Sequence, residues 1–133
     1  MILDTSAIIA ILFKEPEARS LIEAIGRAEA VLIAAPTLVE ATQVSEGRVG
    51  PAMREELDDL LLTMKPEIVP FTAELAQVAR DGWRRYGKGR HPAGLNLGDC
   101  FAYALAKSRG EPLLFKGNDF SKTDVKAALA PHA

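Results

Sequence analysis

The sequence predicts an α/β domain of three layers, α/β/α, in which helices cover both faces of a short-stranded, mainly parallel central sheet. Short apolar runs alternate with segments of helical character along the chain. The apolar runs are not interrupted by alternating polar residues, which is typical of strands buried on both faces. The length of 133 residues suits one domain, 1–133, and a hydrophobic fraction of 48% can fill its core.

The first half of the chain contains two expected strands. Residues 1–3 are apolar and end at an acid, and residues 30–35 form a second buried run. Between them, residues 6–13 and 16–27 are expected to be helical, the latter because its apolar side chains recur at helical spacing. Residues 36–46 follow as a helix, since a proline at the first helical position loses no hydrogen bond there.

The second half continues the alternation. Residues 51–64 are expected to form a helix that opens at a proline and has leucines on one face. Residues 67–71 form a third strand, and the helix 72–86 begins at a threonine suited to N-capping. Residues 112–115 form a fourth strand, and a final helix over 122–129 closes the chain.

One further helix, 98–108, lies between the helix 72–86 and the fourth strand. Asn96 is suited to cap its N-terminus and Gly110 to end it. Asp99 falls in its first turn. This helix therefore holds an acid at a helix start, as the segment after the second strand also does.

Four acids stand near the ends of different elements. Asp4 follows the first strand, Glu40 lies early in the helix after the second, and Asp119 follows the fourth. Asp99 joins them if its helix start faces the same edge, which is an assumption. Because ligands of parallel sheets bind beyond the carboxyl ends of the strands, the four are expected to form one acidic site.

Such a cluster favours a divalent cation. Carboxylates a few ångströms apart cannot all stay ionised unless a raised pKa or a cation compensates. Mg²⁺ prefers oxygen ligands, usually one or two carboxylates with water and phosphate oxygens. A metal held by Asp4 and Asp99 could activate water and stabilise a phosphoryl transition state. The sequence thus makes phosphodiester hydrolysis a chemically sensible activity.

Each acid also has a purely structural interpretation. Asp4 could N-cap the next helix, and Glu40 could be a favourable charge near a helix N-terminus. Asp99 could complete a capping box with Asn96. Asp119 could stabilise a turn. The joint pattern favours a site more strongly than any member does, because the acids occupy corresponding ends of different elements.

Taken together, four segments resemble the PIN domain family, and more closely the VapC toxins of type II toxin–antitoxin pairs. They keep the order and spacing of the family over essentially the whole chain. The segments are MILDTSA at 1–7, APTLVEA at 35–41, LNLGDCFAYALA at 95–106 and LLFKGNDFSKTD at 113–124.

The resemblance implies a ribonuclease dependent on Mg²⁺ or Mn²⁺, with a three-layer α/β/α fold. In this comparison Asp4 and Asp99 match the principal metal ligands, and Glu40 and Asp119 match the other catalytic acids. Thr5 and Ser6 match small polar positions beside the first acid. The resemblance also implies a homodimer and inhibition by a small cognate antitoxin.

The sequence departs from the family at one place. Many PIN domains carry an additional Asp two positions before the Asp-Phe pair, where this chain has Gly117. Asn118 could contribute a neutral oxygen there instead. The departure makes the role of Asp119 the least secure of the four.

A basic segment precedes the third matching motif. It holds five bases and one acid, with Trp83 and Tyr86 interleaved, and could contact RNA through phosphate attraction and base stacking. It could equally be a solvated helix end. The bases are Arg80, Arg84, Arg85, Lys88 and Arg90.

Composition limits the other possibilities. A net charge of −2 argues against a generally basic nucleic-acid binder, and a single cysteine excludes a disulfide scaffold. The longest early apolar run, 7–13, is too short to span a bilayer, so a cytoplasmic protein without membrane contact is expected.

Two alternative functions stay open. A phospho-receiver domain also has a parallel sheet and an acidic Mg²⁺ pocket, but the third strand here leads into Pro70-Phe71-Thr72 with no phosphorylatable Asp. A non-catalytic interaction protein with a relic acid cluster is the other.

Overall fold

The computed structural model describes residues 1–130, so the last three residues of the predicted domain lie outside the described part. Its sheet has four strands in the order β3-β2-β1-β4, and every neighbouring pair is parallel. The α/β/α class predicted from the sequence is therefore confirmed. The strands are β1 (Ile2–Leu3), β2 (Leu32–Ala34), β3 (Glu67–Val69) and β4 (Leu113–Leu114).

In the described part of the chain, six α-helices connect and cover the strands. Three of them begin at side-chain caps that the sequence supplies: Asp4, Thr72 and Asn96 each accept a hydrogen bond from a backbone N–H of the first turn. Gly110 ends the last helix in the left-handed conformation. The helices are α1 (Thr5–Leu12), α2 (Ala18–Arg27), α3 (Ala35–Val49), α4 (Met53–Met64), α5 (Ala73–Tyr86) and α6 (Leu97–Arg109).

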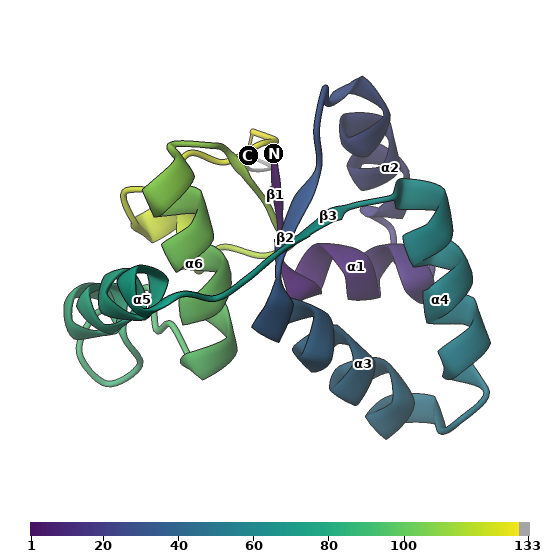
Figure 1. Cartoon of the computed structure of the whole chain (residues 1–133), viewed down its shortest axis with the longest axis horizontal. Helices are drawn as coiled ribbons and strands as arrows, with labels where there is room; N and C mark the ends of the chain where they lie inside the picture. Colours follow the sequence, from purple (N-terminus) through teal and green to yellow (C-terminus); the bar gives the residue numbers. More distant parts are fainter. Residues whose placement is uncertain (131–133) are drawn as a thin grey trace.

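The sheet separates two hydrophobic cores. In Figure 1, α5 and α6 lie on one side of the strands and α1 to α4 on the other. Consecutive strand residues face opposite sides, so Ile2 belongs to the core under α5 and α6, and Leu3 to the core under α1 to α4. Both side chains are fully buried. This coverage explains why β1, β2 and β4 are apolar throughout, whereas the edge strand β3 begins with the exposed Glu67.

The predicted final helix over 122–129 is wrong. A short 3-10 turn, η1 (Phe120–Lys122), is followed by bends and by an isolated bridge in which Ala127 pairs with Leu113 of β4. The N–H of Leu113 donates to the carbonyl of Lys126 at 2.8 Å, and Ala128 donates back to Leu113 at 2.8 Å. Pairing satisfies the backbone of an otherwise open sheet edge, and this tertiary contact overrides the local helical pattern.

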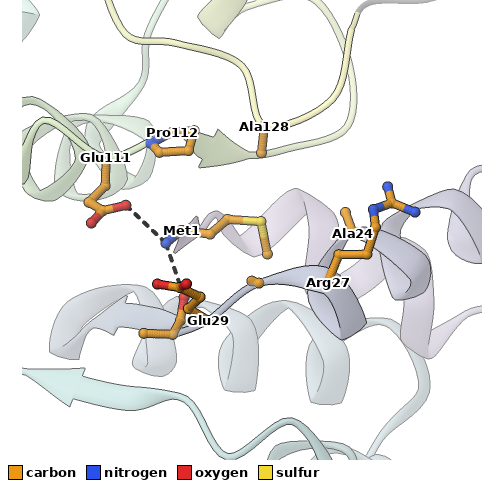
Figure 2. Close-up of a pocket in the computed structure, with 9 residues that line it drawn as sticks. Met1, Ala24, Arg27, Glu29, Glu111, Pro112 and Ala128 are labelled. Carbon is orange, nitrogen blue, oxygen red and sulfur yellow. Dashed lines mark hydrogen bonds and ion pairs between the residues drawn. The ribbon is translucent and has the colours of Figure 1, made fainter.

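The amino ends of the strands meet at the edge of the sheet away from the acids. Figure 2 shows a pocket of about 380 Å³ there, around Met1. The Met1 amino group donates to the Ala30 carbonyl at 3.1 Å and forms an ion pair with Glu111 at 3.3 Å. These contacts fix the start of β1 against the segments that lead into β2 and β4. Within residues 1–130, no helix has the length and apolar character needed to cross a bilayer.

Candidate functional site

Three of the four predicted acids meet at the carboxyl end of β1. Asp4, Glu40 and Asp99 line one pocket of about 260 Å³, together with Thr5 and Ser6. Asp4 comes from the end of β1, Glu40 from α3 and Asp99 from the start of α6. The assumption that the helix of Asp99 faces this edge is therefore confirmed.

Asp4 is buried at the junction between β1 and α1. Its Oδ2 accepts hydrogen bonds from the N–H of Ser6 at 3.0 Å and from the Ser6 hydroxyl at 2.6 Å. Its Oδ1 is buried without a hydrogen-bond donor. Burial raises the pKa of Asp4 to about 7, and the charges of Asp99 and Glu40 add to the rise although Ser6 opposes it. Capping of α1 thus engages Oδ2 alone and leaves Oδ1 without a hydrogen bond.

Glu40 reaches the site from the second turn of α3. Its Oε1 accepts a hydrogen bond from the Thr5 hydroxyl. Its carboxylate lies directly against Gly98 in the first turn of α6. Glu40 therefore contacts the elements that carry Asp4 and Asp99.

Asp99 forms the capping box that the sequence predicted. Its Oδ2 accepts from the Asn96 N–H at 3.1 Å, while its own N–H donates to Asn96 Oδ1 at 2.8 Å. Burial raises the pKa of Asp99 to about 6, with further contributions from the charges of Asp119 and Glu40. The adjacent Cys100 is buried, and burial raises the pKa of its thiol to about 11, which rules out a thiolate nucleophile at neutral pH.

Asp119 and Asn118 lie outside the acid pocket. Asp119 is exposed just before the 3-10 turn, and it is near enough for its charge to raise the pKa of Asp99. Asn118 lines a different pocket, beside Gly117. The structure thus brings together three of the four predicted acids and leaves the fourth at the periphery.

Three charged residues of the pocket were missed by the sequence analysis. Glu15, Arg48 and Lys116 line it alongside the acids. Lys116 forms ion pairs with Glu15 and Glu17, and Arg48 lies 4.0 Å from Glu15. The backbone N–H of Lys116 also donates to the Ser6 hydroxyl at 3.0 Å. No local motif marks these residues, since only the fold brings α1, α3 and the chain after β4 together.

The predicted basic segment occupies the end of α5 and the following loop. Arg80 and Arg84 line an apolar groove of about 460 Å³ beside Trp83 rather than the acid pocket. Arg85 pairs with Asp124 at 3.3 Å. The guanidinium of Arg90 stacks on Trp83, 4.3 Å from the ring centre. Helix α6 contributes to both, because Cys100 lines the groove and Asp99 lines the acid pocket.

The donors of the acid pocket suit a hard divalent cation. Within residues 1–130, no three Asp, Glu, His or Cys side chains stand close enough to hold an ion between them. A Mg²⁺ site commonly needs only one or two carboxylates, with water and phosphate completing the shell. The unpartnered Oδ1 of Asp4 and the raised pKa values of Asp4 and Asp99 are features that a cation would compensate. Both residues therefore fit the ion.

Comparison with known sequences gives matches that cover nearly the whole chain. The PIN domain model matches residues 1–126. A ribonuclease VapC from Mycolicibacterium smegmatis is 47% identical over 127 residues, covering 96% of this chain and 98% of that protein.

Solved structures share the fold at low sequence identity. The VapC20 toxin of Mycobacterium tuberculosis, described as cleaving the sarcin-ricin loop, superposes with a TM-score of 0.75 at 17% identity and covers 98% of both chains. A chain of a toxin–antitoxin complex from Klebsiella pneumoniae gives a TM-score of 0.68 at 18% identity and covers 92% of both. These likenesses support the fold assignment independently of sequence.

Proposed function

The chain belongs to the PIN domain family, and from this premise we propose that it is a VapC-type ribonuclease that hydrolyses RNA phosphodiester bonds as the toxin of a toxin–antitoxin pair. The observation that carries the proposal is the pocket in which Asp4, Glu40 and Asp99 converge at the carboxyl edge of the sheet. The 47% identical relative is named as a ribonuclease VapC, which supports the proposal. Membership of this family also leaves the phospho-receiver alternative without support.

The proposed cofactor is Mg²⁺, or Mn²⁺, held by Asp4 and Asp99. When bound, such an ion supplies the positive charge that acidifies water and stabilises a phosphoryl transition state. Burial and the two hydrogen bonds from Ser6 to Oδ2 fix the orientation of the Asp4 carboxylate that would bind the ion. Oδ1 is left without a competing donor.

Glu40 is the proposed proton acceptor. Its Oε1 is engaged by Thr5, and among the described residues no donor bonds its Oε2. We assign to Oε2 the task of taking the proton of the attacking water. The water oxygen attacks phosphorus in line with the 3′ oxygen, the bond between phosphorus and that oxygen breaks, and the leaving 3′ oxygen takes a proton from solvent, which gives a 5′-phosphate and a 3′-hydroxyl. Asp119 is proposed as a peripheral acid that acts through its charge on Asp99.

RNA is expected to approach across the basic groups nearest the pocket. Arg48 and Lys116 line the pocket itself and can attract the phosphates on either side of the scissile bond. The basic segment at the end of α5 is proposed to hold the strand further away, with Arg90 and Trp83 forming a stacked pair that could support a base.

A small antitoxin is the proposed protein partner, since a neighbour of the same fold is a toxin–antitoxin complex. The homodimer implied by the family resemblance also stays a proposal. Sedimentation equilibrium of the isolated chain tests the dimer, and co-purification with the product of an adjacent reading frame tests the antitoxin.

The activity is tested by incubating a mixed RNA pool with the protein and Mg²⁺. Cleavage is expected, with 5′-phosphate ends, and it should be lost in EDTA and in Asp4→Asn. Asp59→Asn is the matched control, because it removes the same charge at an exposed position on α4, away from the pocket. If Asp4→Asn cleaved RNA as well as Asp59→Asn does, the assignment of the active site to the pocket around Asp4 would be wrong.

A further inference from the structure

Gly98 occupies the second position of α6, between the capping residue Asn96 and the site acid Asp99. A Cβ at this position would lie 2.7 Å from Glu40 Oε1 and closer still to Glu40 Oε2 and Cδ. Real Cβ atoms essentially never approach other heavy atoms to within 3.0 Å. The Glu40 carboxylate therefore occupies the volume in which any other residue at 98 would place its side chain.

The backbone gives no other reason for a glycine here. The conformation of Gly98 is helical, whereas glycines with positive φ are found elsewhere in the described chain, as at Gly110. Inside a helix, glycine is less favourable than alanine, because it loses more conformational freedom on folding. Two other glycines also make close approaches, but Gly82 faces the ring of Tyr103 and Gly87 faces Trp83. Gly98 differs in facing a carboxylate of the acid pocket.

We infer that Gly98 is a positioning residue, whose missing side chain lets the Glu40 carboxylate rest on the first turn of α6 beside Asp99. The free N–H groups of a helix start favour a negative charge at that place. The steric relation between Gly98 and Glu40 stands on the geometry alone. Its consequence for RNA cleavage rests on the proposed function.

Alanine at 98 is expected to move Glu40 rather than to unfold the protein. The atoms that its methyl group would meet are the end of a flexible side chain, which can rotate away. Rotation would break the hydrogen bond from Thr5 and carry the charge of Glu40 away from Asp4 and Asp99. The helix itself would gain propensity.

A double-mutant cycle on the melting temperature, measured without metal, tests the steric relation. In a Glu40→Ala background the carboxylate that opposes a side chain at position 98 is gone, so only the gain in helix propensity is left. Gly98→Ala should therefore raise the melting temperature by roughly 2–4 °C there. In the wild-type background that gain should be absent or reversed. Gly26→Ala, at an exposed helical site with open space around it, is the control and should give the same shift in both backgrounds. Equal shifts for Gly98→Ala in the two backgrounds would overturn the inference.

Kinetics supply the second measurement. Gly98→Ala should lower kcat on the order of tenfold or more while KM for RNA stays within about twofold, because the groups proposed to grip RNA do not move. Unchanged kcat in Gly98→Ala, with a coupled melting temperature, would overturn the positioning role. If the wild-type protein cleaves no RNA, the proposed function fails, and the thermal cycle still decides the steric relation.

Discussion

The Thr5 hydroxyl donates a hydrogen bond to Glu40 Oε1 and so joins the first turn of α1 to α3 within the acid pocket. Thr5 is 7% exposed, so water offers its hydroxyl little alternative. The bond leaves one oxygen of Glu40 engaged and directs the other toward the start of α6. The position of Glu40 thus depends on a donor from one side and on the missing side chain of Gly98 from the other.

Thr5→Val should lower kcat because it removes this donor while keeping the shape of the side chain. Loss of one hydrogen bond to a partly buried carboxylate is expected to cost about 1–3 kcal/mol of stability, measured by urea unfolding. Thr5→Ser, which keeps the hydroxyl, should recover most of both losses. Equal losses of kcat and stability in Thr5→Val and Thr5→Ser would show that the hydroxyl alone does not account for the role of Thr5, and would contradict this prediction.

Without divalent ions, stability should fall as pH rises from about 4 to about 7. The pKa of Asp4 is raised from an ordinary 3.8 to about 7, so between these values the folded state holds a proton that the unfolded state has released. The free energy of unfolding then decreases by up to about 1.4 kcal/mol per pH unit for one such proton. Asp99, with a pKa of about 6, acts in the same direction.

Asp4→Asn should remove most of this slope. Its amide oxygen can still accept from the Ser6 N–H, and it places no charge in the buried site. Thermal unfolding in EDTA at pH 5 and pH 8 measures the effect. If stability fell with pH as steeply in Asp4→Asn as in the wild type, Asp4 would not be the source of the pH dependence. Asp59→Asn serves as the control for the loss of a surface charge.

Asp124 should contribute stability with the opposite pH dependence. Although burial opposes its ionisation, hydrogen bonds from Lys107 at 2.8 Å and Tyr103 at 2.9 Å hold its pKa below the ordinary 3.8. Its contribution is therefore complete above about pH 4 and is lost as pH falls below that value. Asp124→Asn should cost about 1–3 kcal/mol at pH 7 and much less at pH 2.5, measured by urea unfolding.

Arg48→Gln and Lys116→Gln should weaken RNA binding in a salt-dependent way. Each is expected to reduce the slope of log K against log salt by about 0.7, the value for one phosphate contact to a single strand. Arg19→Gln is the control, since Arg19 is exposed on α2 and pairs with Glu23. Unaltered slopes in both pocket variants would assign RNA attraction to the basic segment, where Arg80→Gln and Arg84→Gln are the next variants to measure.

The fold and most of the acidic site could be predicted from the sequence because they follow from local rules. Apolar runs gave the strands, and the rule that ligands bind at the carboxyl ends of parallel strands located Asp4 and Glu40. The capping box around Asp99 was visible as a spacing of three from Asn96. The local sequence pattern predicted a helix over 122–129 wrongly, because pairing with β4 determines the backbone conformation there.

The remaining parts of the site depend on contacts between distant segments. Glu15, Arg48 and Lys116 come from three places in the chain, and only the packing of α1 and α3 against the loop after β4 unites them. Asp119 was expected beside the other acids, but the bend after β4 leaves it exposed. A signal for Gly98 did exist, since a glycine inside a helix is less stable than alanine there and suggests a packing reason. The sequence could not show which group approaches it.

The most direct test of the account is calorimetric titration of the purified protein with Mn²⁺. We predict binding of a divalent ion in the wild type and in Asp59→Asn, and its loss in both Asp4→Asn and Asp99→Asn. A melting temperature that rises with Mn²⁺ only in the first two proteins should accompany it. Absence of binding and of any thermal shift in the wild type would contradict the metal site and favour a non-catalytic interaction protein.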